Sequence, residues 1–383
     1  MIHVMHRHAP TRPLVACIVA LAAAATAAAE WPAFRGDPLQ HGRVAEAVIE
    51  DPELLWTHAT GGPVLSTAAI ADGRVYVGSD DGRLHCLELA TGKVLWTFDA
   101  GKPVQSPPLV HRGRVFFGAH DGVMRCVSAA DGALQWTFAT GDKIIGGANL
   151  DARNNRIVFG SYDSKLYALD AETGKLAWEH TTDNYINGTP AILGERTIVG
   201  GCDGFVHRVE LATGVPQPPL PVEAYIAGSA AVDRDRAWLG HYGNRFICVD
   251  LTAGKIAWEY GPREFAFFSS PALDPQRDIV VFGGRDRRVH AARASDGTPL
   301  WEFRTRGKVD ASPVIAGDKV VAASEDGRVY LLKLDDGSEV WSYLIGQPLV
   351  ASPAVSDGRI VIGSEDGRVY CFGPPADDAD PDP

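Results

Sequence analysis

The sequence predicts an all-β fold, an eight-bladed β-propeller with four antiparallel strands in each blade, from three observations. Tryptophan returns at intervals of about forty residues, a period typical of repeat arrays of this kind. A glycine stands four residues before each tryptophan position inside the array, and short strands separated by turn-forming residues lie between. The recurring tryptophans are Trp56, Trp96, Trp136, Trp178, Trp258, Trp301 and Trp341. The glycines are Gly92, Gly132, Gly174, Gly214, Gly254, Gly297 and Gly337.

Residues 61–98 show how one unit of the repeat makes a blade. Short runs of small, β-branched or alternating residues are separated by turns, and the Asp81-Gly82 turn favours a tight hairpin. No stretch of the chain shows sustained helical periodicity. The four strands expected in this unit cover residues 63–70, 74–78, 84–87 and 94–98.

The two ends of the array predict how the ring closes. The last unit ends at Phe372 without a fourth strand, whereas residues 54–57 carry a tryptophan but precede the first unit. We therefore expect residues 54–57 to pair with the strand at Val369, closing the eighth blade and removing two sheet edges. One tryptophan is missing in the gap of 80 residues between Trp178 and Trp258, where Pro218 occupies its position.

We expect the innermost strands and the tryptophans to have structural roles. Small residues are required where eight strands crowd around an axis, and each tryptophan is expected to dock between adjacent blades. Four of the cysteines, Cys86, Cys126, Cys248 and Cys371, share one repeat position. Equivalent points of neighbouring blades should lie ~12 Å apart, beyond the reach of a disulfide, which predicts free thiols. The small inner residues are Ser66, Ser106, Gly146, Gly147, Gly188, Gly228, Ala311 and Ala351.

The ends of the chain are expected to lie outside the ring. Residues 1–29 have a basic start, an apolar run and a small-residue end, which predict a cleaved signal peptide and a periplasmic or secreted protein. Cys17 is not expected to be a lipid anchor, because the apolar run follows it rather than precedes it. We assign residues 30–52 to a lead-in segment, 53–373 to the propeller and 374–383 to an acidic disordered tail.

Composition excludes some classes of function. The formal net charge of −12 and pI of about 5.4 argue against a nucleic-acid partner. We expect a monomer with no transmembrane span after signal cleavage. No catalytic motif, no cysteine–histidine set at zinc spacing and no cofactor site was found, so the prediction includes no catalytic residue, no metal and no cofactor.

The stretch from Ala168 to Trp178, with Asp170 and Gly174 between, resembles the tryptophan-docking motif of the PQQ-like propeller repeat. The resemblance covers about residues 53–373. Two groups share this repeat: quinoprotein dehydrogenases, and non-enzymatic proteins similar to the BamB subunit of the outer-membrane assembly machinery. The opening Trp31-Pro-Ala-Phe-Arg-Gly36 also looks like the lead-in of many secreted members.

The resemblance leaves two functions open. Quinoprotein dehydrogenases typically show an adjacent cysteine pair and calcium ligands from Glu, Asn and Asp with a catalytic Asp. This chain has no Cys-Cys pair, and Asp310 is the only obvious carboxylate for the catalytic position. We therefore favour a non-enzymatic binding or scaffold protein with a protein partner in the cell envelope. The alternative is a PQQ-dependent quinoprotein oxidoreductase.

The candidate binding site is a set of aromatic and basic residues on one face of the ring. The turns after the fourth and second strands share a face, and in the third to sixth units these turns are rich in rings. Tyr and Arg are favoured at interface centres. The alternative is that the rings merely fill space near the channel. The predicted residues are Tyr162, Tyr185, Tyr225, His241, Tyr242, Phe265, Phe267, Phe268 and Arg285.

Overall fold

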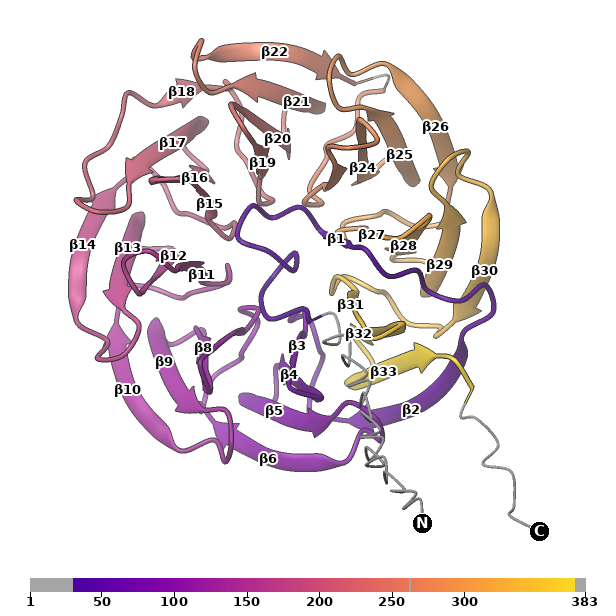
Figure 1. The fold of residues 1–383 in the computed structure, drawn as a ribbon, viewed down its shortest axis with the longest axis horizontal. Coiled ribbons are helices and arrows are strands. Elements are labelled where there is room, and N and C mark those ends of the chain that lie inside the picture. Colours follow the sequence, from indigo (N-terminus) through magenta and orange to yellow (C-terminus); the bar gives the residue numbers. More distant parts are fainter. Residues whose placement is uncertain (1–29, 262, 376–383) are drawn as a thin grey trace, which may run out of the picture.

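Eight sheets surround a central axis in the computed structural model, which describes residues 30–261 and 263–375 (Figure 1). The signal peptide predicted for residues 1–29, with Cys17, and the tail from residue 376 lie outside the described residues. The described part of the chain contains no helix, and hence none that could cross a membrane. The predicted fold class, an eight-bladed all-β propeller, is confirmed.

Each blade consists of four antiparallel strands arranged in order from the axis to the rim, and the outermost strand of each blade faces solvent. The first blade contains β3 (Ala69–Ala71), β4 (Arg74–Gly78), β5 (Arg83–Glu88) and β6 (Val94–Asp99). The second contains β7 (Leu109–His111), β8 (Arg114–Phe117), β9 (Val123–Ser128) and β10 (Leu134–Ala139). The third contains β11 (Asn149–Asp151), β12 (Arg156–Gly160), β13 (Lys165–Asp170) and β14 (Leu176–Thr181). The fourth contains β15 (Ala191–Leu193), β16 (Arg196–Gly200), β17 (Phe205–Glu210) and β18 (Leu220–Pro221).

The second half of the ring repeats the same arrangement. The fifth blade contains β19 (Ala231–Asp233), β20 (Arg236–His241), β21 (Arg245–Asp250) and β22 (Lys255–Tyr260). The sixth contains β23 (Ala272–Asp274), β24 (Ile279–Gly284), β25 (Arg288–Arg293) and β26 (Pro299–Arg304). The seventh contains β27 (Val314–Ala316), β28 (Lys319–Ala323), β29 (Arg328–Lys333) and β30 (Glu339–Leu344), with β1 (Arg43–Val44) alongside β27. The eighth contains β31 (Ala354–Ser356), β32 (Arg359–Gly363), β33 (Arg368–Gly373) and β2 (Glu53–Ala59).

The ring is closed by strands from opposite ends of the chain. β2 pairs antiparallel with β33, and Figure 1 shows the two strands side by side. In this register Leu54 lies opposite Phe372 and Trp56 lies opposite Cys371. The predicted closure by the N-terminal strand is therefore confirmed.

Neighbouring blades are joined by the repeated tryptophans. The ring of Trp96 is buried, and its Nε1–H donates to the carbonyl of Ala129 in the next blade at 3.1 Å. A Cβ on Gly132 would lie 2.7 Å from the same ring, so only a glycine leaves room for it. Trp56, Trp136, Trp178, Trp258 and Trp301 make the same two contacts with the blade that follows each of them.

The thiols stand beside these tryptophans within each sheet. Cys86, Cys126, Cys248 and Cys371 are the cross-strand partners of Trp96, Trp136, Trp258 and Trp56. All five cysteines in the described residues, including Cys202, are buried and free of disulfide bonds. Burial raises the pKa of Cys86 to about 12, so its thiol stays protonated and unreactive at neutral pH.

The fourth blade achieves the same docking without a tryptophan. Leu220 occupies the space beside Gly254, the glycine of the next blade, at 3.3 Å from its Cβ position. Arg208 replaces the missing indole donor, because its guanidinium donates to the carbonyl of Leu251, which is the equivalent acceptor. The blade that lacks the repeated residue therefore keeps its contact with its neighbour through two other side chains.

A belt of hydrogen bonds links the innermost segments around the axis. Six junctions use a backbone N–H of one blade and a hydroxyl of the next. The other two junctions, on either side of the second blade, differ because Pro107 and Gly147 have no hydroxyl to accept a hydrogen bond. There the hydroxyls of Ser66 and Ser106 donate to the carbonyls of Ser106 and Gly146. The six pairs, donor first, are Gly147–Thr189, Thr189–Ser229, Ser229–Ser270, Ser270–Ser312, Ser312–Ser352 and Ser352–Thr67.

The predicted small inner residues are required by close approach of the backbones. A Cβ on Gly146 would lie 2.8 Å from the carbonyl oxygen of Gly188, and one on Gly188 would lie 2.9 Å from that of Gly228. Ser66, Ser106, Ala311 and Ala351 are fully buried or nearly so. The prediction that crowding at the axis selects small residues is confirmed.

The lead-in segment crosses one end of the channel. Figure 1 shows residues 30–52 running from β3 across the centre of the ring to β2. Between Trp31 and Val44, its carbonyl oxygens accept hydrogen bonds from the innermost strands of seven blades. The bound strand residues are Ile70, Val110, Asn149, Ile192, Val232, Leu273 and Ile315.

Arg35 holds the middle of this segment in place. Its side chain is fully buried, and its guanidinium donates to the carbonyls of Pro271, Ser312 and Pro313 in the sixth and seventh blades. Burial lowers the pKa of Arg35 to about 9, against the opposing effect of the Asp37 charge. The end of the channel that carries the first-to-second-strand turns is therefore covered by the protein's own chain.

The tryptophan–glycine contact can be tested by a pair of substitutions. Gly132 and Gly113 have similar positive φ angles, 75° and 69°, but only Gly132 faces a tryptophan. Both Gly132→Ala and Gly113→Ala carry the same backbone strain of about 1–2 kcal/mol. We expect Gly132→Ala to lose about 1–3 kcal/mol more because the new methyl group overpacks against Trp96. Urea unfolding of both variants measures the difference, and equal losses would contradict the docking role.

Candidate binding face

The end of the channel opposite the lead-in carries two rings of turns. One ring consists of the connections from each fourth strand to the next blade, and the other of the turns between second and third strands. In each blade the two are joined by a backbone hydrogen bond, for example from the N–H of Tyr242 to the carbonyl of Tyr225 at 2.9 Å. We call this end the open face.

The first part of the predicted site is a stacked pair of tyrosines. The rings of Tyr162 and Tyr185 lie 4.5 Å apart at an interplanar angle of 9°. The Nζ of Lys143 lies 4.4 Å from the centre of the Tyr162 ring, and the Tyr162 hydroxyl donates to Asn187 at 2.8 Å. These contacts fix the plane of the stack, because both its outer side and its hydroxyl have partners.

The second part of the site continues across the next blades. The rings of Tyr225 and Tyr242 lie 6.3 Å apart, and those of Tyr242 and Phe268 lie 4.2 Å apart. The guanidinium carbon of Arg285 lies 3.7 Å above the Phe268 ring. We call Tyr162, Tyr185, Tyr225, Tyr242, Phe265, Phe268 and Arg285 the aromatic arc.

Four members of the aromatic arc are solvent-exposed. Tyr185, Tyr225, Tyr242 and Phe265 are 37%, 55%, 50% and 49% exposed. Among the described residues, they are the large aromatic side chains with such exposure, and all four lie on the open face. The other exposed large hydrophobic residues are aliphatic, so the rings are concentrated on one surface.

Two predicted residues lie below the surface. Phe267 is 2% exposed and His241 is 5% exposed, so neither side chain is available to a partner. Phe267 packs against Phe246, Tyr260 and Phe282 in the core between blades. Burial, followed by the Arg245 charge, lowers the pKa of His241 to about 4, so it stays neutral.

An inserted residue explains the position of Phe267. The N–H of Arg285 donates to the carbonyl of Ala266, which makes Ala266 rather than Phe265 the equivalent of Tyr185 and Tyr225. The connection after β22 is therefore one residue longer than the others. Phe267 then falls at the repeat position of Ile186 and Ile226, both of which are fully buried. Counting from that apolar position, rather than from the tryptophan, would have placed it in the core.

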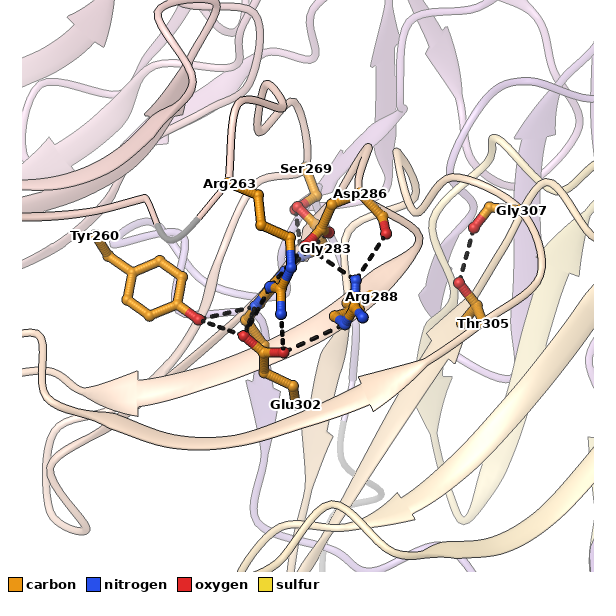
Figure 2. Close-up of polar contacts among 10 residues, drawn as sticks. Tyr260, Arg263, Ser269, Gly283, Asp286, Arg288, Glu302, Thr305 and Gly307 are labelled. Atoms are coloured by element: carbon orange, nitrogen blue, oxygen red, sulfur yellow. Dashed lines mark hydrogen bonds and ion pairs between the residues drawn. The ribbon is translucent and has the colours of Figure 1, made fainter.

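The lengthened connection is held by a cluster of charges in the sixth blade. Figure 2 shows the side chains of Tyr260, Arg263, Arg288 and Glu302 converging at this point. Arg263 donates to both oxygens of Glu302 at 2.9 Å, and Arg263 also contacts Asp286 at 3.2 Å.

A buried histidine joins the two carboxylates of this cluster. The Nε2 of His290 lies 3.0 Å from Asp286, and its Nδ1 lies 3.0 Å from the Tyr260 hydroxyl and 3.6 Å from Glu302. The same spacing of four residues joins Asp81 to His85 in the first blade. The recurrence indicates that the aspartate–histidine pair is a structural feature of the repeat.

Asp310 lies at the channel mouth, but its carboxylate is engaged. Arg285 donates to both of its oxygens, at distances from 2.7 to 3.1 Å. Within residues 30–261 and 263–375, no three or more His, Cys, Asp or Glu side chains gather as metal ligands. The Asp310 carboxylate is therefore paired with a cationic side chain in this structure.

The charge cluster predicts a pH-dependent stability. The hydrogen bond from Arg263 lowers the pKa of Glu302, so this carboxylate stabilises the fold above its unfolded pKa and ceases to do so as pH falls through the folded value. We expect Glu302→Gln to cost about 1 kcal/mol at pH 7 and less at pH 3. Urea unfolding at both pH values measures it.

A second carboxylate provides the matched control. Glu179 forms a more exposed ion pair with Lys165, at 2.7 Å, in the third blade. Because solvent screens this pair, Glu179→Gln should cost less than Glu302→Gln at pH 7. If Glu302→Gln cost the same at both pH values, the ionic contribution of the cluster would be refuted.

The comparisons with solved structures concern the fold. BamB from Moraxella catarrhalis is 19% identical, with a TM-score of 0.69, covering 85% of this chain and 98% of that one. Quinohemoprotein alcohol dehydrogenase from Comamonas testosteroni is 14% identical, with a TM-score of 0.77 and coverage of 90% and 80%. A europium-containing methanol dehydrogenase is 12% identical, with a TM-score of 0.76 and coverage of 90% and 98%. Comparison with curated proteins finds no match.

The family comparison covers nearly the whole propeller. The model of the outer membrane protein assembly factor BamB family matches residues 40–260 and 266–375. The short interval between the two matches contains Phe265 and falls within the lengthened connection after β22, where this chain departs from its own repeat. On this match and on its PQQ-like propeller fold, the chain belongs to the BamB family.

Proposed function

We propose that this protein is a non-enzymatic binding or scaffold propeller of the cell envelope, and that the aromatic arc receives a protein partner. The observation that carries the proposal is the concentration of exposed rings on the open face. Tyr and Phe rings supply large contact areas with few rotatable bonds, so little conformational entropy is lost when they are covered. Family membership and the signal peptide expected in residues 1–29 support a partner in the periplasm or outside the cell.

The geometry of the arc suits a partner that lies across several blades. Its members come from connections and turns of the third to sixth blades, each fixed by backbone hydrogen bonds to its neighbour. The lead-in occupies the opposite end of the channel, so the open face is the channel end left accessible among the described residues. A rigid aromatic surface with Arg285 at one end has the composition of an interface centre.

Removal of two exposed rings tests this proposal. Tyr225→Ala with Phe265→Ala should reduce retention of the partner by about thirtyfold or more, because truncated interface anchors typically cost 2 kcal/mol or more. The measurement is affinity capture from the native envelope with quantitative mass spectrometry, alongside the melting temperature of each variant.

The control removes exposed apolar side chains of comparable exposure from outer strands. Leu134→Ala with Leu176→Ala should retain every partner that the unmodified protein retains. If the ring variant lost thermal stability but kept the same partners, the rings would serve only to fill space at the channel mouth.

The second candidate is a PQQ-dependent quinoprotein oxidoreductase. It is favoured by the fold likeness to quinohemoprotein alcohol dehydrogenase and by the position of Asp310 at the channel mouth. This function predicts that added quinone and calcium raise the melting temperature and give bound-quinone absorbance, and that Asp310→Asn weakens both effects. Absence of any shift with the unmodified protein would count against it.

A further inference from the structure

The outer edge of the fourth blade has a sequence unlike any other part of the ring. Residues 215–221 read Val-Pro-Gln-Pro-Pro-Leu-Pro, so every residue of the segment is a proline or directly precedes one. Proline fixes its own φ near −65°, and the residue before a proline is confined to extended or polyproline II conformations. The whole segment is therefore restricted to an extended backbone before any tertiary contact forms.

The sheet holds this segment along one side only. β18 has two residues, whereas the outer strands of the other blades have six or seven. Pro216 forms an isolated bridge with Val209, and the N–H of Gln217 donates to the carbonyl of Arg208 at 2.8 Å. The Arg208 guanidinium donates to the carbonyl of Pro218 at 2.9 Å. These contacts position the segment without covering its outer side.

The prolines themselves face solvent. Val215 is 56% exposed, Pro216, Pro218, Pro219 and Pro221 are exposed, and Leu220 alone is buried beneath them. A polyproline II helix has three residues per turn, so in that conformation Val215, Pro218 and Pro221 would form one apolar row. Pro216 and Pro219 would form a second row beside it. The segment thus presents two hydrophobic–proline dipeptides, Val215-Pro216 and Pro218-Pro219, separated by one glutamine.

Protection of the sheet edge does not by itself require this pattern. Proline on an edge strand prevents pairing with another chain, and one or two prolines are enough for that purpose. This segment has four prolines. They form two pairs, Pro216 with Pro219 and Pro218 with Pro221, and the members of each pair are three residues apart. The blade joins its neighbour through Leu220 and Arg208 instead of a tryptophan, and the rings of Pro216, Pro218 and Pro219 stay exposed.

We propose that residues 215–221 are a polyproline II ligand on the rim of the propeller, and that the partner is a protein domain with an aromatic-lined groove. Such grooves take proline-rich segments because a preformed extended helix loses little entropy on binding. The rim segment lies along the outer edge of the fourth blade, whereas the aromatic arc lies in turns of the open face. The inference therefore stands independently of the proposed function.

A nuclear magnetic resonance titration tests the proposal. The probe is a ¹⁵N-labelled recombinant SH3 domain that accepts hydrophobic–proline dipeptides, titrated with the full unlabelled propeller. We expect the resonances of its aromatic groove to shift. Pro216→Ala with Pro219→Ala should weaken the apparent affinity by about tenfold or more, since both dipeptides lose their proline.

Two further variants make the result specific. Val215→Glu keeps every proline but places a charge in the apolar row, and it should also weaken binding. Pro299→Ala removes an exposed proline from the outer strand of the sixth blade and should bind the probe like the unmodified protein. Circular dichroism and melting temperature verify that each variant is folded.

Three outcomes would overturn the proposal. No groove shift with the unmodified protein would show that the segment is not presented as a ligand. Equal shifts with the Pro216→Ala, Pro219→Ala variant would show that the probe domain does not recognise these prolines. If that variant bound unchanged but self-associated, the prolines would be assigned to protection of the sheet edge instead.

Discussion

The contact between an indole ring and a glycine turn of the next blade is the interaction on which the structure depends. Each sheet is curved and partly exposed, and it is stable only when its faces are covered by the neighbouring sheets. The indole supplies a large apolar surface and one N–H donor, which meets a backbone carbonyl beside the glycine turn. Because the turn carries no side chain at that point, the ring can lie flat on its backbone. Repetition of one local contact therefore builds a closed body.

Closure imposes a difference between the two ends of the channel. One end is spanned by the lead-in, whose carbonyls and buried Arg35 satisfy polar groups of seven blades. The belt of hydroxyl hydrogen bonds joins the innermost segments of neighbouring blades around the axis. With these groups satisfied inside the ring, the open face is free to vary in composition. Its third to sixth blades have become aromatic, while Glu325 and Glu365 occupy the matching turns of the seventh and eighth.

Two of the features that suggest binding occur where the repeat is broken. The connection after β22 has gained one residue, which pushes Phe265 into solvent and is held by the charge cluster around Glu302. The fourth blade has lost its tryptophan and presents prolines at its edge. Trp341 has no glycine turn to meet, because the eighth blade is formed from both ends of the chain, and it packs on Phe372 instead. In a repeat protein the regular positions are needed for packing, so function is expected at the irregular ones.

The sequence by itself determined the number of blades, their strand order and the closure by residues 54–57, because these follow from a period and from two unpaired ends. It also predicted the small inner residues, since crowding at an axis acts on every repeat alike. Only the tertiary structure decided that Phe267 and His241 are buried. For Phe267, a one-residue insertion changes which side chain faces the core, and a count from the tryptophan does not register it. Likewise, the burial of Arg35 depends on carbonyls more than 200 residues away along the chain, which no local pattern encodes.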